Sequence, residues 1–227
     1  MSGATSPVPS RKTGPEAATA VPRIVVLGET DYETTWRAMR EHVTRTAGER
    51  REAIWITSHP PVFTQGRAGR HEHLVAPGDI PVVSSDRGGQ VTYHGPGQTV
   101  VYTLIDIKAR GIGIRRFVAL LEAAVIDVLA AQGLEGRRRK GAPGVYVDGA
   151  KIAALGLRLK DGMTYHGVAL NVAMDLEPFR RIHPCGYAGL EVTQLSDFGI
   201  DTAPEDAGRA IAGAVKARLC ELTPARN

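Results

Sequence analysis

The chain has 227 residues, of which 28 are Lys or Arg, 24 are Asp or Glu and only two are Cys. A hydrophobic fraction of 43% with 23% charged residues is ordinary for a globular protein and excludes disordered and collagen-like chains. Two cysteines are too few for a disulfide framework or a cysteine-rich zinc site, so we expect a protein of a reducing compartment, the cytoplasm.

Charge and hydropathy exclude several kinds of partner. The first 20 residues hold no apolar core long enough for a signal peptide, and no apolar run elsewhere reaches the roughly 18 residues of a membrane span. The net charge of +4 mildly favours an acidic partner but falls short of a nucleic-acid footprint. The basic run Arg137–Lys140 is expected to be a solvated loop. We therefore expect neither a membrane nor a nucleic acid as partner.

The N-terminal part of the chain predicts a tail followed by a helix. Residues 1–22 are small and polar and are expected to be disordered, whereas residues 23–227 are expected to form a single domain. Thr30 and Glu33 have the spacing of a capping box. Apolar residues at helical spacing follow, namely Tyr32, Trp36, Met39 and Val43.

Further elements follow in chain order. Strands are expected at 53–57 and 80–83, a long helix about 117–129 ended by Gly133, and a last helix about 211–219. Between those helices, Asp148-Gly149 and Asp161-Gly162 are typical of hairpin turns. The sequence therefore predicts an α/β fold with a mixed, largely antiparallel sheet flanked by helices, without regular βαβ alternation.

Three segments have compositions that are unfavourable for packing in a protein core. The first, residues 87–98, holds four glycines, which let a backbone approach a ligand closely and present its N–H groups. It matches neither the phosphate loop G-x-x-x-x-G-K-[ST] nor G-x-G-x-x-G, so a nucleotide site has no local support. Glycine pairs also occur in plain hairpins, and both interpretations stay open.

The second segment carries a lysine in an apolar strand. If the strand begins after Asp148-Gly149, alternation places Lys151 on the same face as Ala153, Leu155 and Leu157. Lys151 then either reaches water from the strand end or lies on an apolar wall, where a neutral amine can accept a proton.

The third segment carries a cysteine in irregular backbone. Cys185 lies between Pro184 and Gly186, close to His183, and is expected to face a cleft. A thiol nucleophile needs a base or a cationic neighbour, for which Lys151, His183 and His94 are the candidates. Cys220 follows Leu219 in the last predicted helix and is expected to pack as a small buried hydrophobe.

With these segments the sequence closely resembles the lipoyl(octanoyl) transferases, which act in lipoate biosynthesis. The matching stretches are RGGQVTYHGPGQ at 87–98, GAKIAALGLR at 149–158, YHGVALNV at 165–172 and HPCG at 183–186 followed by TQL at 193–195. Four motifs in the same order make the resemblance specific, and it covers about 200 residues. Only the first 22 residues fall outside it.

The resemblance implies a fold, a reaction and a set of site residues. The fold would be that of the catalytic domain of lipoate and biotin protein ligases. Octanoyl would move from acyl carrier protein to a lysine amine of a lipoyl domain through a thioester on Cys185, with Lys151 as base and His183 in a possible supporting role. The pocket for the acyl group and pantetheine would be lined by Arg87, Gly88, Gly89, Gln90, Val91, Thr92, Tyr93, His94, Ala154, Leu155, Gly156, Gly167, Val168 and Ala169.

The same resemblance implies the partners. They would be octanoyl-acyl carrier protein and the lipoyl domains of 2-oxoacid dehydrogenase complexes and of the glycine cleavage H protein, and the enzyme would be a monomer. Neither ATP nor a metal would be needed, because the donor already carries a thioester. Carrier proteins are acidic, so Arg67, Arg70 and the run Arg137–Lys140 are candidates for electrostatic steering.

Three alternatives remain at this stage. An ATP-dependent lipoate or biotin ligase would share the fold, but the GRGRxG signature of biotin ligases is absent and a cysteine occupies HPCG. A non-catalytic module that binds carrier protein would tolerate loss of Cys185 and Lys151. A Cys-His peptidase is the third, although the residues around Cys185 match no peptidase signature.

Overall fold

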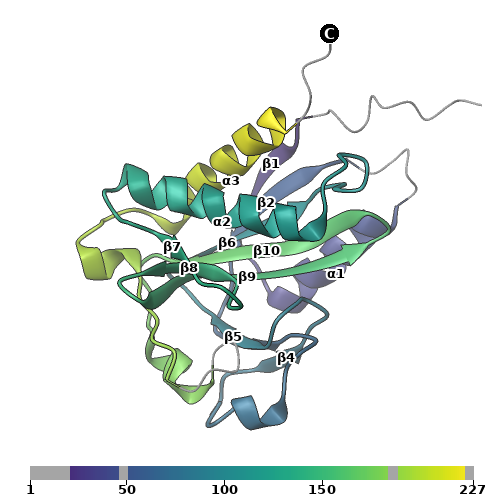
Figure 1. Cartoon of the computed structure of the whole chain (residues 1–227). Helices are drawn as coiled ribbons and strands as arrows, with labels where there is room; N and C mark the ends of the chain where they lie inside the picture. The colour runs from purple at the N-terminus through teal and green to yellow at the C-terminus, as the bar shows by residue number, and fades with distance from the viewer. Residues whose placement is uncertain (1–20, 46–50, 184–188, 223–227) are drawn as a thin grey trace, which may run out of the picture.

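The structure is a computed structural model that describes residues 21–45, 51–183 and 189–222. The predicted tail up to residue 20 therefore lies outside the described residues, as does Cys185. A seven-stranded sheet and a smaller three-stranded sheet form the frame (Figure 1). The strand order of the large sheet is β1-β2-β6-β10-β9-β8-β7, and that of the small sheet is β4-β3-β5.

The strands and helices have the following bounds. The large sheet contains β1 (Arg23–Glu29), β2 (Ala53–Ser58), β6 (Gln98–Leu104), β7 (Arg137–Arg138), β8 (Gly144–Val147), β9 (Ala150–Lys160) and β10 (Met163–Asn171). The small sheet contains β3 (Val62–Gln65), β4 (Val82–Ser84) and β5 (Val91–His94). The α-helices are α1 (Tyr32–Thr44), α2 (Ile114–Ala131) and α3 (Pro204–Glu221), and short 3-10 turns are η2 (His71–His73), η3 (Glu177–Arg181) and η5 (Leu195–Phe198).

The predicted mixed, largely antiparallel sheet is confirmed. Within the large sheet only β1 and β2 pair in parallel, and the other neighbours are antiparallel. Both predicted hairpin turns are present, joining β8 to β9 and β9 to β10. Asp148 and Asp161 have φ of 48° and 49°, and the glycine after each is also left-handed, as a two-residue hairpin turn requires.

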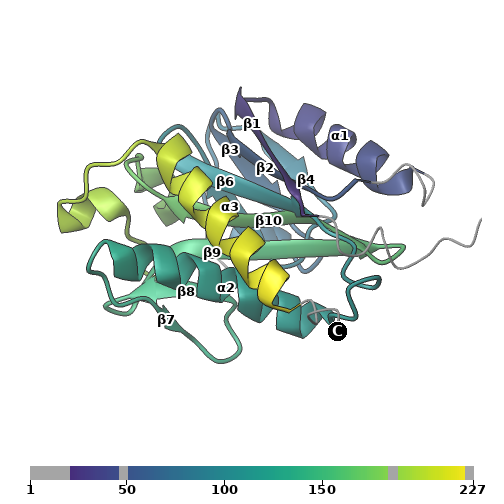
Figure 2. The same ribbon diagram turned by 90° about the horizontal axis from the view of Figure 1, so that it is seen from above.

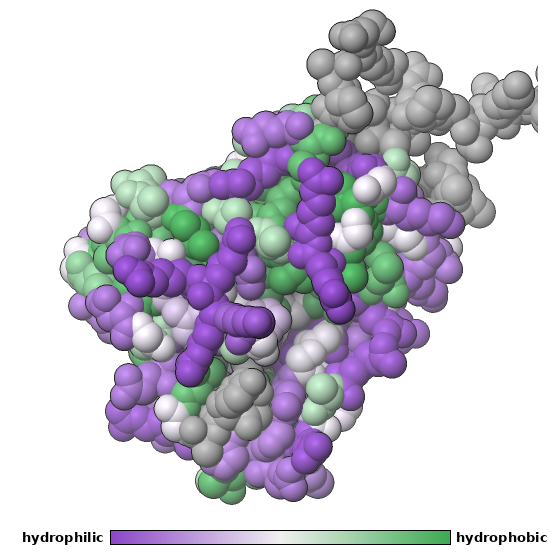
Figure 3. Space-filling model, viewed as in Figure 1, coloured by the Kyte–Doolittle hydropathy of each residue, from purple (hydrophilic) through white to green (hydrophobic). Residues whose placement is uncertain are grey.

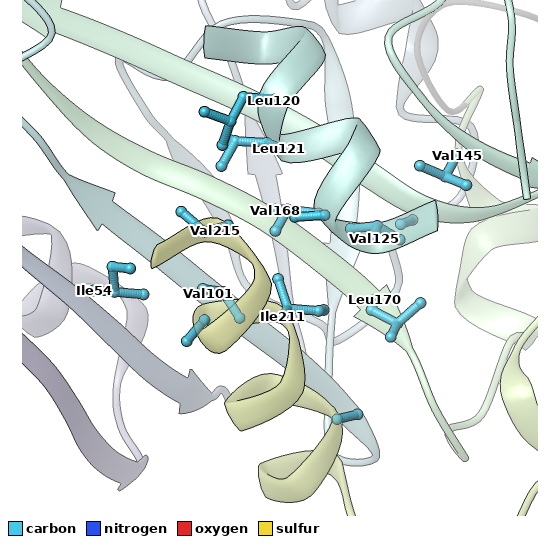
Figure 4. Packing of buried hydrophobic residues seen from close by; sticks show 14 of the residues in the cluster. Ile54, Val101, Leu120, Leu121, Val125, Val145, Val168, Leu170, Ile211 and Val215 are labelled. Atoms are coloured by element: carbon cyan, nitrogen blue, oxygen red, sulfur yellow. The ribbon is translucent and has the colours of Figure 1, made fainter. Parts of the chain in front are cut away.

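Helices α2 and α3 cover one face of the large sheet (Figure 2). Their apolar stripes bury Leu121, Val125, Ile211 and Val215 against strand residues such as Val168 (Figure 4). Gly133, with φ of 78°, follows the end of α2 as predicted. Helix α1 covers part of the opposite face, so the two faces of the sheet have different neighbours.

Several local predictions are wrong. The N-cap of α1 is Asp31, whose side chain accepts a hydrogen bond from the Thr34 N–H, while the Thr30 hydroxyl bonds to Thr57 instead. The strand expected at 80–83 begins at Val82, because Pro81 has no N–H to donate to a ladder.

The basic run and the second cysteine also differ from expectation. Arg137 and Arg138 form the edge strand β7 instead of a loop. Cys220 is exposed, because one residue along a helix is a turn of about 100° from buried Leu219. Seen from the side of Figure 1, hydrophilic side chains cover most of the surface and the hydrophobic patches are scattered (Figure 3). Among the described helices, none has both the length and the apolar character needed to cross a bilayer.

Candidate active site

A cavity lies between the two sheets, on the face of the large sheet that α1 partly covers. It is lined by Tyr32, Arg87, Gly89, Gln90, Val91, Thr92, His94, Val100, Tyr102, Ala154, Leu155, Gly156, His166, Gly167, Val168 and Ala169. Twelve of the fourteen residues predicted to line a pocket are in this set. The structure thus brings residues 87–94, 154–156 and 167–169 together, while their binding role stays a prediction.

The register of the strands orders the floor of the cavity in three rows. Residues directly opposite in antiparallel strands share a face, and every second residue returns to it. The first row is Ala154, Ala169 and Val100, the second is Gly156, Gly167 and Tyr102, and the third is Arg158, Tyr165 and Leu104. Small residues on β9 and β10 therefore leave open space over the first two rows, whereas no residue of the third row, which includes Tyr165, lines the cavity.

Close backbone contacts explain the two glycines of the second row. A Cβ on Gly167 would lie 2.0 Å from the carbonyl oxygen of Val101, and one on Gly156 would lie 2.8 Å from that of Gly88. Gly88 does not line the cavity, but its N–H donates to the Leu157 carbonyl at 2.9 Å and ties the glycine-rich segment to β9.

Arg87 is buried, and its side chain hydrogen-bonds to the backbone of the glycine-rich segment and to β3. Its Nε donates to the Thr64 hydroxyl at 3.0 Å, and its guanidinium also donates to the carbonyl oxygens of Thr64 and Gly88. Tyr93, in contrast, does not line the cavity. Strand alternation turns its side chain to the other face of β5, where it packs with Phe63 and Phe179.

A chain of buried hydrogen bonds links three of the motifs. His94 Nδ1 lies 2.7 Å from Gln98 Oε1, the Gln98 amide donates to Asn171 Oδ1 at 2.9 Å, and the Asn171 amide donates to the Thr193 carbonyl at 2.9 Å. Because Gln98 offers its carbonyl to the ring, His94 must donate from Nδ1. Burial lowers the pKa of His94 to about 3, so the ring is neutral near pH 7.

A second set of buried hydrogen bonds lies beside this chain, with the ring centroids of His59 and His94 5.8 Å apart. His59 Nδ1 faces the Thr30 carbonyl at 2.6 Å and its Nε2 faces the Tyr102 hydroxyl at 2.7 Å. Burial lowers the pKa of His59 and raises that of Tyr102, so both stay neutral at neutral pH. The ring of Tyr32 stacks on His94 with centroids 5.8 Å apart. The rim of the cavity thus carries polar groups that are mostly satisfied by one another.

Lys151 lies on the cavity face of the sheet because of a β-bulge. Tyr146 pairs with Lys151, but the neighbouring Val145 pairs with Ala153, so Ile152 is an extra residue in β9. Val145 and Tyr146 are consecutive in β8 and therefore point to opposite faces of the sheet. Their partners in β9, Ala153 and Lys151, point to opposite faces as well. The prediction that Lys151 shares a face with Ala153, Leu155 and Leu157 is therefore wrong.

The surroundings of Lys151 are closely packed. The residue is 4% exposed, its Nζ donates to the Pro143 carbonyl at 3.1 Å, and Nζ lies 5.3 Å from the ring centroid of Tyr146. A Cβ on Gly144 would lie 3.0 Å from Lys151 Cε, so this glycine leaves room for the lysine side chain. The backbone of Lys151 is bonded to Glu191 and Thr193, which fixes the base of the side chain.

The cysteine motif is only partly described. Cys185 lies outside the described residues, whereas His183 donates its N–H to the His73 carbonyl at 2.9 Å, and the two rings lie 6.2 Å apart. The turn at His71–His73 therefore holds the chain that leads into HPCG. His183 is two residues from Cys185 in sequence, and its supporting role stays a prediction.

Sequence reasoning missed six residues of the site. Tyr32, Val100, Tyr102 and His166 line the cavity, and His59 and Asp86 lie behind it. Of these, His166 stands inside the quoted YHGVALNV motif and Asp86 directly precedes the glycine-rich segment, so their positions beside matched motifs were the available signal. Val100 and Tyr102 follow the glycine-rich segment by two and four residues, whereas Tyr32 and His59 lie far from every matched motif and had no such signal.

Comparisons with known proteins agree with this geometry. The family model described as the lipoyl protein ligase A/B catalytic domain matches residues 31–216. An octanoyltransferase of Thiobacillus denitrificans is 54% identical over 216 residues, which cover 95% of this chain and 98% of that protein.

Solved structures show the same fold. A bipartite lipoate protein ligase of Thermoplasma acidophilum, described with its E2 lipoyl domain, has a TM-score of 0.69 at 19% identity and covers 87% of this chain and 83% of its own. The biotin protein ligase of Aquifex aeolicus, in complex with biotin and ATP, has a TM-score of 0.58 at 12% identity, covering 88% and 72%. The predicted likeness to the ligase fold is confirmed.

Proposed function

This chain belongs to the lipoyl protein ligase A/B catalytic domain family and is an octanoyltransferase, and from that premise we propose its donor, acceptor and mechanism. The donor is octanoyl-acyl carrier protein and the acceptor is a lysine amine of a lipoyl domain. Cys185 is the nucleophile that carries the octanoyl group between them as a thioester. Lys151 is the base.

The observation that carries this proposal is the position of Lys151. The bulge at Ile152 turns the only lysine in the first half of β9 onto the face that bears Ala154 and Gly156, the small residues of the cavity floor. Bulges next to active sites commonly re-aim one side chain in this way. Lys151 is not among the residues that line the cavity, but its side chain lies next to Gly144, the strand partner of the lining residue Ala154. A buried amine at that position fits a base that serves a reacting carbonyl at the mouth of the channel.

The channel itself supports an acyl substrate. Its floor is Ala154, Ala169, Gly156 and Gly167, with the Val100 side chain beside them. Burying the seven carbons beyond the carbonyl contributes roughly 5 to 6 kcal/mol at about 0.8 kcal/mol per CH₂. Such a surface suits a saturated chain.

Two transfers complete the reaction. In the first, Lys151 Nζ takes the proton of Cys185 Sγ and the thiolate attacks the donor carbonyl carbon. A new C–S bond forms, the bond to the pantetheine sulfur breaks, and that sulfur takes the proton. In the second, the acceptor amine attacks the enzyme thioester, a C–N bond forms, the C–S bond to Cys185 breaks, and Lys151 passes the amine proton to Sγ.

The partners and conditions of the proposal follow from this chemistry. Thioester exchange is nearly isoenergetic and amide formation is downhill, so the scheme requires neither ATP nor a metal ion. A reduced Cys185 is required, which agrees with the expected cytoplasmic setting. Lipoyl domains of 2-oxoacid dehydrogenase complexes and of the glycine cleavage H protein are the proposed acceptors, as a lipoyl domain is named with the T. acidophilum ligase. A monomer suffices for the scheme.

The carrier protein is proposed to approach the basic surface of the chain. Arg67, Arg70 and the run Arg137–Lys140 are exposed. Some of this charge is compensated, since Arg137 pairs with Glu135 at 2.9 Å and Arg138 with Glu122 at 3.3 Å. Arg139, whose guanidinium lies 6.0 Å from the Tyr146 ring, shares that ring with Lys151 and is the strongest candidate for steering.

The test uses the full chain mixed with octanoyl-acyl carrier protein, without ATP, and intact mass spectrometry. We expect an octanoyl adduct on Cys185 that a lipoyl domain discharges. Cys185→Ser should form no thioester, and Lys151→Met should slow adduct formation at least 100-fold, the scale of a general base. Lys160→Met, at the other end of β9, is the matched control and should keep the wild-type rate.

Four outcomes would contradict the proposal. Full turnover by Cys185→Ser would exclude the thioester, and equal rates for Lys151→Met and wild type would exclude Lys151 as base. If only His183→Ala lost adduct formation, the base would be His183. Transfer from free octanoate that depends on ATP would make the chain a ligase.

A further inference from the structure

The two ends of the cavity floor differ in chemistry. Lys151 precedes the first row along β9, and Tyr165 stands in the third row. The first and third rows are four residues apart, which is about 14 Å at the rise of an antiparallel strand. The open floor between the first and third rows is therefore limited in length as well as in width.

The end at the third row is built by two consecutive rings. His166 has φ of 61°, a left-handed conformation that is uncommon for residues other than glycine. Its ring stacks on that of Tyr165 with centroids 5.0 Å apart and planes 27° apart. Neighbouring residues of a regular strand point to opposite faces, so this backbone conformation is what brings both rings to one side, where His166 reaches the cavity.

Asp86 holds the two rings in place. It accepts hydrogen bonds from Trp36 Nε1 at 2.8 Å, from the Tyr165 hydroxyl, and from His166 Nε2 at 2.9 Å. Burial alone would raise the pKa of Asp86, but the hydrogen bonds from His166 and Tyr165 outweigh it and lower the pKa to about 2. Because burial lowers the pKa of His166, the pair at pH 7 is a carboxylate with a neutral imidazole and not an ion pair.

The length of an octanoyl chain matches this space. A fully extended chain advances about 1.2 Å per bond, so eight carbons span about 8 to 9 Å and two more add about 2.5 Å. The Lys151 amine reaches the level of the first row, because a Cβ on Gly144, the strand partner of Ala154, would lie 3.3 Å from Nζ. With the carbonyl at that level, the eighth carbon lies about 8 to 9 Å along the floor, just past the second row at about 7 Å, and a tenth carbon at about 11 Å meets the ring of His166, on which Tyr165 stacks. Asp86 hydrogen-bonds to both rings and to Trp36 of α1, so the rings are held in place and resist displacement by a longer acyl chain.

We infer that the stacked Tyr165–His166 pair, held by Asp86, closes the acyl channel opposite Lys151 and sets the longest acyl chain that the enzyme transfers. The inference rests on the proposed function in placing the reacting carbonyl at the Lys151 end. It assigns to His166 a role in substrate selection that is separate from the chemical step.

The test is a chain-length profile of overall acyl transfer with hexanoyl, octanoyl, decanoyl and dodecanoyl carrier protein. Wild type is expected to have a decanoyl kcat/KM at least tenfold below its octanoyl value. His166→Gly removes the ring at a left-handed position that suits glycine, so the fold is kept. It should raise the ratio of decanoyl to octanoyl kcat/KM at least tenfold, and His166→Asn, which also tolerates this conformation, should give an intermediate ratio.

The matched control is Val100→Ala, which enlarges the first row instead of the far end and should leave the ratio within twofold of wild type. Thermal unfolding of each variant confirms that it is folded. An unchanged ratio in His166→Gly, a wild type that transfers eight to twelve carbons alike, or a folded His166→Gly inactive with every donor would each overturn the inference. Because the ratio is measured on overall transfer, absence of a Cys185 adduct would instead overturn the proposed mechanism alone.

Discussion

Acidification should destabilise the fold through His94. Burial depresses its pKa from 6.5 to about 3, with the buried His59 acting in the same direction. The unfolded chain therefore binds a proton between those pH values that the folded chain does not, and stability falls as pH falls below about 6.5. At pH 5 this linkage costs about 2 kcal/mol, since the interval of 1.5 pH units is worth about 1.36 kcal/mol per unit.

The structural cause is specific. His94 donates from Nδ1 to Gln98, so acid would have to protonate Nε2, which has no acceptor among the described residues. Urea unfolding at pH 7.5 and pH 5 is the assay, with His94→Gln as the variant. The wild type should lose about 2 kcal/mol more than the variant between the two pH values, while the contributions of His59 and His166 remain in both. Equal losses in the two proteins would refute the reasoning.

Two further predictions concern stability. Gly167→Ala would place a Cβ 2.0 Å from the Val101 carbonyl oxygen and should lower the free energy of unfolding by at least 3 kcal/mol, about the upper range of overpacking. Gly213→Ala, at an exposed and open position in α3, is the control and should be neutral or stabilising in the same urea titration. Glu52→Gln would remove the carboxylate that pairs with the buried guanidinium of Arg110, since the two side chains are 6% and 4% exposed and hydrogen-bonded to each other. A loss of about 3 to 5 kcal/mol is expected, against less than about 1 kcal/mol for Glu205→Gln in the exposed pair with Arg209. A loss for Glu52→Gln as small as that for Glu205→Gln would contradict the second.

The sequence predicted those parts of the fold that depend on local patterns. Asp148-Gly149 and Asp161-Gly162 determine the two hairpins because the turn needs left-handed backbone at both central positions, and no distant residue changes that requirement. Helix α3 was predicted from its apolar spacing for the same reason. The predicted cap at Thr30 failed because Thr57, 27 residues away, competes for the Thr30 hydroxyl.

The candidate site shows the same division. The glycines and small residues that line the cavity stand in contiguous motifs, so the resemblance found them together. The hydrogen bonds of Asp86 join residues 50, 79 and 80 positions away, and nothing in the local sequence signals such contacts. Tyr93 was assigned to the pocket because its neighbours were, although strand alternation turns it to the opposite face.

Two departures from regular strand geometry account for the chemical asymmetry of the channel. On β9 the cavity face carries the even-numbered residues 154, 156 and 158, so Lys151 belongs to it only because of the extra residue Ile152. On β10 the same face carries 165, 167 and 169, and His166 joins it only through its left-handed backbone. A regular pair of strands would thus supply the small-residue floor with neither the amine at one end nor the second ring at the other. Reasoning from alternation must fail at these two residues, and they are the two to which we assign the base and the limit on acyl-chain length.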